Sequence, residues 1–189
     1  MPTTTKLLAE LASHMVEAKA KQLLREGRLP QSVVFLRDGI VVAVVDARWK
    51  DEEGKGLVIG QCVDLGRALA ADAVLHVVDA FLNVISEDGS EGQIEMLMAV
   101  GVTTEPQSVG SMLPYRRDEA GQMHFDLETR SEVEQLFSSK GSLGGAIVEQ
   151  LRQIPQLCTT PNEVLAMAHG ALLESLDADV FFFESPTSQ

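Results

Sequence analysis

Two acids and one lysine could carry out metal-assisted hydrolysis. Asp46 and Asp79 are read as acids at the C-terminal ends of two predicted strands, and Lys55 follows Glu53 and Gly54 in the polar stretch between those strands. A metal-dependent phosphodiesterase places an acid on one strand and an acid-x-Lys pair on the next, so that carboxylates hold Mg²⁺ and lysine orients the attacking water. Here the acid-x-Lys triplet falls in a predicted loop, so this hydrolase is the alternative hypothesis.

Two short clusters combine basic and aromatic side chains against an acidic background, which makes them candidates for recognition. Trp and Tyr offer a large apolar face with a polar end, and Arg can bind carboxylates in a forked geometry. The other interpretation is that the aromatic rings cover the ends of a sheet and the cations are solvated. If the clusters converge, they form the best candidate binding site. Their members are Arg48, Trp49 and Lys50, and Tyr115, Arg116 and Arg117.

Motifs for cofactor, metal and nucleophile chemistry do not occur in the sequence. It contains neither a GxxxxGK[ST] nor a GxGxxG phosphate-binding loop, no HExxH or CxxC zinc pattern, and no GxSxG elbow. Cys62 and Cys158 have no metal-type spacing and form no disulfide framework. We therefore expect no cofactor and no metal, and the sequence favours a non-enzymatic role.

Length and charge limit the classes of function. The 189 residues fit one domain of ordinary size, and 45% are hydrophobic, which is enough for a sizeable core. The net charge of -13 argues against binding to a phosphate backbone, so no nucleic-acid partner is expected. No apolar run is long enough to span a membrane and the N-terminus does not resemble a signal peptide, so we expect a cytoplasmic protein without a membrane partner.

Charge is distributed unevenly along the chain. Residues 1–50 carry eight Lys/Arg and five Asp/Glu, whereas residues 51–189 carry seven and 23. This asymmetry could orient self-association of a basic segment against an acidic surface, or it could simply reflect two separate solvated faces.

The first half of the chain predicts a helix, a hairpin and a second helix. Apolar residues within 4–27 recur at helical spacing and form one face, with Gly27 as the stop. The β-branched runs 32–37 and 40–46 flank Asp38-Gly39, a dipeptide suited to a type I′ turn because both central residues need positive φ. After a polar loop, residues 57–72 have helical spacing.

The second half predicts a meander of strands followed by helices. Residues 73–85 form an apolar run typical of a central strand, and three antiparallel strands are expected at 94–104, 109–116 and 122–126. Helices are expected at 129–140 and 142–154, and a last one, capped by Thr160, at 161–176. The apolar run 179–184 reads as an added edge strand or a docked tail.

These elements predict an α+β fold with a largely antiparallel sheet of five or six strands and helices packed on it. We expect a core domain at 1–140, a helical extension at 141–184 that packs on the same core, and a frayed tail at 185–189. In element order alone, residues 4–140 resemble the roadblock and longin group of interaction domains. The leading hypothesis is a binding or scaffold module with a protein partner, most simply a second copy of the chain as a homodimer.

Overall fold

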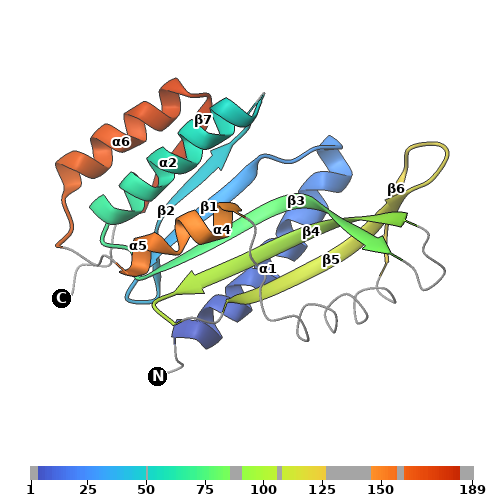
Figure 1. Cartoon of the computed structure of the whole chain (residues 1–189), viewed down its shortest axis with the longest axis horizontal. Helices are drawn as coiled ribbons and strands as arrows, with labels where there is room; N and C mark the ends of the chain where they lie inside the picture. The colour runs from blue at the N-terminus through green and yellow to red at the C-terminus, as the bar shows by residue number, and fades with distance from the viewer. Residues whose placement is uncertain are drawn as a thin grey trace.

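The computed structural model describes residues 4–49, 51–85, 91–105, 108–126, 146–156 and 160–183. Figure 1 shows one sheet with α1 on one side and the other described helices on the opposite side. The helices are α1 (Thr4–Glu26), α2 (Glu52–Ala68), α4 (Ala146–Leu151), α5 (Gln153–Gln156) and α6 (Glu163–Ser175). The strands are β1 (Gln31–Arg37), β2 (Ile40–Ala47), β3 (Ala73–Ile85), β4 (Glu91–Thr103), β5 (Val109–Arg117), β6 (Met123–Phe125) and β7 (Ala178–Phe182).

The described strands form a single antiparallel sheet in the order β6-β5-β4-β3-β1-β2-β7. This confirms the predicted α+β class, and the sheet has seven strands where five or six were expected. The additional strand is β7, which pairs with β2 at the end of the sheet. The apolar run near the C-terminus is therefore an edge strand.

The β1-β2 hairpin forms as its turn residues predict. Asp38 and Gly39 have φ of 54° and 75°, the positive values that a type I′ turn requires at both positions. The main-chain amide of Asp38 also donates to the carboxylate of Asp72, at 2.9 Å. This contact ties the turn to the loop before β3.

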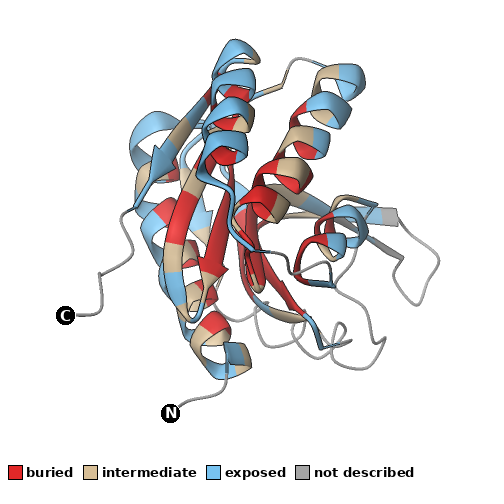
Figure 2. Ribbon diagram, turned by 90° about the vertical axis from the view of Figure 1, so that its left-hand side faces the viewer, coloured by how far each residue is buried: buried red, intermediate tan, exposed pale blue. Residues whose placement is uncertain are grey.

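The face of the sheet under α1 holds one part of the core. Leu8, Val16 and Leu23 project from α1 onto β1, β3, β4 and β5. A Cβ added to Gly101 of β4 would lie 2.5 Å from a Leu8 side-chain carbon, so the helix approaches the sheet closely at this glycine. Figure 2 shows the buried residues gathered where the helices face the sheet.

The opposite face is covered by α2, α4, α5 and α6, which enclose the second part of the core. The helix α2 begins five residues earlier than the expected start at residue 57. Asp51 caps it, because its carboxylate accepts from the main-chain amide of Gly54 at 2.7 Å, and Glu52 and Glu53 suit the positive end of the helix. The capping carboxylate outweighs the glycines that suggested a loop.

The C-terminal part differs from the prediction in its cap. The residue that caps α6 is Asn162, whose side-chain oxygen accepts from the amide of Leu165 at 3.1 Å, and the expected cap Thr160 lies before the helix. Asn162 has an extended backbone and is placed to reach that amide. The expected helix at 129–140 and the tail at 185–189 lie outside the described residues.

Candidate functional site

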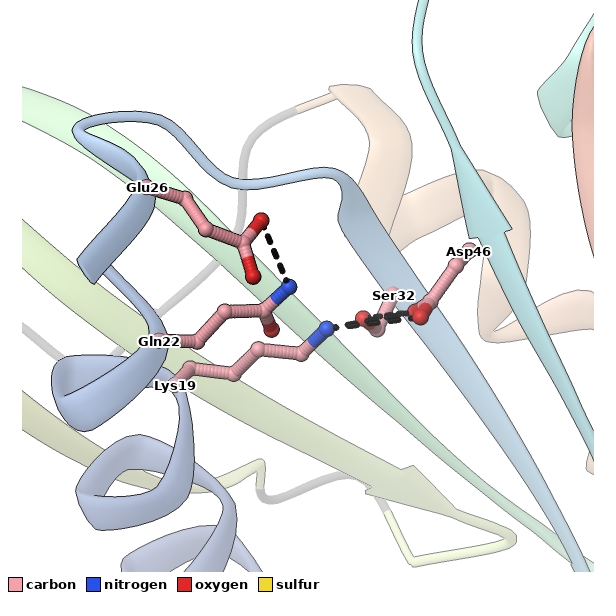
Figure 3. A network of polar contacts seen from close by, with 5 residues as sticks. All are labelled: Lys19, Gln22, Glu26, Ser32 and Asp46. Atoms are coloured by element: carbon pink, nitrogen blue, oxygen red, sulfur yellow. Dashed lines mark hydrogen bonds and ion pairs between the residues drawn. The ribbon is translucent and has the colours of Figure 1, made fainter.

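Asp46 lies in a polar network between α1 and the sheet (Figure 3). The ammonium group of Lys19, on the sheet-facing side of α1, is 3.3 Å from one carboxylate oxygen of Asp46, and the Ser32 hydroxyl donates to the same carboxylate. The side chain of Lys19 is only 10% exposed. Asp46 is therefore held as one half of a largely buried ion pair.

Asp79 is bound to a different partner. Its carboxylate accepts a hydrogen bond of 2.6 Å from the hydroxyl of Tyr115 on β5. Burial, and after it the hydrogen bond to Asp79, raises the pKa of Tyr115 above its usual value, so the hydroxyl stays protonated and donates. This bond fastens β5 to β3 across the intervening strand β4.

The three candidate hydrolytic residues are not brought together as one set, although Lys55 and Asp79 border a common cleft. Asp79 is also in the middle of β3, not at the end of a strand as expected. Asp46 of β2 lies opposite Ser32 of β1, and Ser32 lies opposite Val77 of β3. Asp79 is therefore two strands away from Asp46 and two residues further along β3. Strand spacings put the Cα atoms of the two acids about 12 Å apart. Lys55 is on α2, which covers the other face of the sheet from α1. No three His, Cys, Asp or Glu side chains among the described residues are grouped to hold a metal ion.

The two basic-aromatic clusters also lie apart. Trp49 packs at the end of β2 against the core on the α2 side, whereas Tyr115 is buried in the core on the α1 side. Strands β1, β3 and β4 separate β2 from β5. Arg48 and Arg116 are exposed, and Lys50 lies outside the described residues. The structure therefore does not unite the clusters into one site.

Each cluster has local contacts that explain it. Trp49 borders a cleft of about 490 Å³. The Tyr115 ring packs edge-on against Phe125, with centroids 6.1 Å apart, and the Arg117 guanidinium lies 5.7 Å from the Tyr115 centroid. Arg117 also pairs with Glu95 at 3.7 Å. The charged residues around the Trp49 cleft are Arg28, Asp46, Arg48, Asp177 and Asp179.

A second cleft, of about 420 Å³, lies between the start of α2, β3 and α4. We call it the His76 cleft. His76 is 3% exposed, and its Nε2 is 3.1 Å from the side-chain oxygen of Gln31. Burial, reinforced by the nearby charge of Lys55, lowers the pKa of His76 to about 4, so the imidazole is neutral at pH 7. The other lining residues include Lys55, Ile59, Val78, Met98 and Ile147.

The outer side of α6 and the adjoining strand β7 expose many apolar side chains. Ala166, Gly170 and Leu173 face the core, and the outward positions of the same helix are apolar as well. A helix that is apolar all round is normally buried on every side. We call the exposed set the C-terminal apolar surface: Val164, Leu165, Met167, Ala168, Ala171 and Leu172 of α6, with Phe181, Phe182 and Phe183 of β7 and the residue after it.

The sequence contained a signal for the C-terminal apolar surface that motif analysis missed, but none for the His76 cleft. Within 163–175 only the first residue, Glu163, and the last two, Glu174 and Ser175, carry a carboxylate or a hydroxyl. This pattern indicates a helix with two apolar faces. The pairing of His76 with Gln31 depends on the register between β1 and β3, which no local pattern specifies.

No protein-family model matches the chain, and neither a curated protein nor a solved structure matches it. The resemblance in element order to roadblock and longin domains thus has no support from these comparisons. None of the described helices combines the length and the apolar character needed to cross a bilayer. A proposal about function therefore has to be argued from the residues of the chain itself.

Proposed function

We propose that this chain is a protein-association module that pairs with a second copy of itself through the C-terminal apolar surface. The observation that carries the proposal is the combination of an edge strand, β7, with an adjoining helix that is apolar on its outer side. Exposed apolar patches of this size mark interaction sites in proteins.

The main chain of β7 supports pairing with a second strand. The amide of Phe183 donates to the carbonyl of Val42, so in the alternating antiparallel pattern residues 179 and 181 bond to β2. The main-chain groups of Ala178, Val180 and Phe182 therefore point to the side of β7 on which no described strand pairs. An edge strand with such groups is a template for another strand.

A second copy is the occupant that fits these features most simply. An antiparallel strand can pair with its own copy about a two-fold axis, so that each side chain meets the same surface on its partner. If that axis passes through Val180, Ala178 lies opposite Phe182 of the second copy. The outward main-chain groups of Ala178, Val180 and Phe182 then all form hydrogen bonds between the two strands. The two sheets would become continuous, with α6 beside α6 because Phe182 packs under Gly170 of that helix.

The apolar area is sufficient for such a dimer. The large side chains of the surface are 40–79% exposed. Roughly 200 Å² is the area of a fully exposed aromatic side chain and an upper bound for an aliphatic one, so these side chains offer up to about 700 Å² over the two faces of β7. A typical stable interface buries about 800 Å² on each partner. Main-chain contacts along β7 would add to this apolar area.

The effect of salt on the dissociation constant distinguishes this apolar dimer from a dimer held by opposite charges. Each copy carries a net charge of -13, and Glu163, Glu174 and Asp179 lie at or beside the surface. Screening of this repulsion should strengthen the dimer, so we expect the dissociation constant to fall severalfold between 50 mM and 500 mM NaCl. Sedimentation equilibrium measures it.

Two results would contradict the proposal. One is a monomer at every salt and protein concentration. The other is a dimer that dissociates as salt is added, because that outcome indicates contact between a basic segment and an acidic surface.

A further inference from the structure

We propose that the His76 cleft binds a small organic anion, a carboxylate attached to an apolar body of several carbons. The inference does not depend on self-association, since the cleft shares no lining residue with the C-terminal apolar surface. Its volume of about 420 Å³ is in the range of small-molecule sites.

The charged residues that line the cleft are Glu52, Lys55 and Asp79, so among these side chains the preference for an anion rests on Lys55 alone. The ammonium group of Lys55 is 3.1 Å from Glu52, whose side chain is 88% exposed. Such an exposed pair contributes little stability, so a ligand carboxylate can replace Glu52 at Lys55. The other acid in the lining, Asp79, directs its carboxylate to the Tyr115 hydroxyl.

The start of α2 adds to this preference. Glu52, Lys55 and Gly56 of the lining belong to the first five residues of this 17-residue helix. The N-terminus of a helix carries a partial positive charge and favours anions within the first turn. Asp51, Glu52 and Glu53 already offset part of this positive charge, so Lys55 contributes most of the preference.

The remaining walls favour an apolar body with a polar contact. Val78, Met98 and Ile147 line the cleft, and they offer aliphatic surface from β3, β4 and α4. The buried Nδ1 of His76 has no hydrogen-bond partner among the described residues. Because buried polar atoms in proteins are nearly always partnered, this unpaired nitrogen in the wall is a second sign of a ligand site.

Octanoate is a suitable probe, titrated into the full ¹⁵N-labelled chain and followed by amide chemical shifts. We expect saturable shifts centred on Lys55, Val78 and Ile147. The uncharged analogue 1-octanol and inorganic phosphate should each bind at least tenfold more weakly, since each lacks one half of the recognised chemistry.

A matched pair of variants tests the role of the charge. Lys55→Met keeps the aliphatic stem and should weaken octanoate about tenfold without changing the affinity for 1-octanol, whereas Lys21→Met, at an exposed position of α1, should change neither. The proposal is overturned by non-saturable shifts, by saturable shifts located on α6, by equal affinity for octanoate and either control compound, or by unchanged binding in Lys55→Met.

Discussion

An Ala168→Glu chain is expected to be a monomer at concentrations where the unmodified chain is a dimer. Ala168 is exposed at the centre of the outer side of α6, one turn from both Val164 and Leu172. In the symmetric dimer the substitution buries two unpaired carboxylates against apolar side chains. Such burial costs several kcal/mol, so we expect the dissociation constant to rise about a hundredfold or more. Sedimentation equilibrium measures the change.

Two further variants separate desolvation from overall charge. Ala18→Glu makes the same change at an exposed position of α1 and raises the negative charge equally, so it should leave the dimer nearly unchanged. Ala168→Lys lowers the net negative charge yet should also dissociate the dimer, because it too buries charge. A dimer that tolerates both substitutions at position 168 would show that α6 is not in the interface.

Lys19→Ala is expected to lower the free energy of unfolding by about 3 kcal/mol, at the lower end for a broken buried pair. The substitution leaves the carboxylate of Asp46 with the Ser32 hydroxyl but without its cation. The effect is moderated because Asp46 is 23% exposed and water can reach it. Asp46 also stands opposite Asp179 in the β2-β7 register, so losing the cation leaves two acids facing each other. Urea unfolding measures the change.

The control for this prediction is Lys21→Ala, at an exposed position of α1 two residues further on, which should change stability by less than about 0.5 kcal/mol. The double variant Lys19→Met with Asp46→Asn removes both charges and should recover more than half of the loss. Equal stabilities for Lys19→Ala and Lys21→Ala would mean that the ion pair does not stabilise the fold. If the double variant does not recover this free energy of unfolding, the loss comes from packing of the Lys19 side chain and not from its charge.

Elements with strong local signals could be predicted from the sequence. The apolar periodicity of 4–27 and the Asp38-Gly39 turn gave α1 and the first hairpin within a residue or two. Here local preference and tertiary packing agree. The predicted start of α2 was wrong because the glycines of its first turns suggested a loop. The predicted cap of α6 was wrong because Thr160 and Asn162 can both cap, and only the folded backbone decides which side chain reaches an amide.

The candidate sites could be predicted only in part, because strand order and register place residues that are distant in sequence. Asp46 and Asp79 were expected at the ends of strands, but Asp46 lies within β2 and Asp79 in the middle of β3. The register gives each acid a separate partner, Lys19 and Tyr115. Lys19 lies on the buried side of α1, where a periodicity analysis expects an apolar residue. The edge position of β7 depends on its pairing with β2, more than 130 residues earlier in the chain.

A cysteine at position 180 tests most directly whether β7 of one chain pairs with β7 of another. In the proposed register Val180 faces Val180 of the second copy in a hydrogen-bonded pair, with Cα atoms about 5.5 Å apart, a separation that a disulfide can bridge. The background should carry Cys158→Ser, since Cys158 lies outside the described residues, while Cys62 is buried. The control is Met123→Cys on β6, at the other edge of the sheet.

Under mild oxidation, followed on a non-reducing gel, we expect Val180→Cys to form a covalent dimer rapidly and nearly completely, at about twice the chain mass of 20.5 kDa. Met123→Cys should remain mostly monomeric. Cross-linking of Val180→Cys that is no faster than that of Met123→Cys would contradict the pairing of β7 with a second copy.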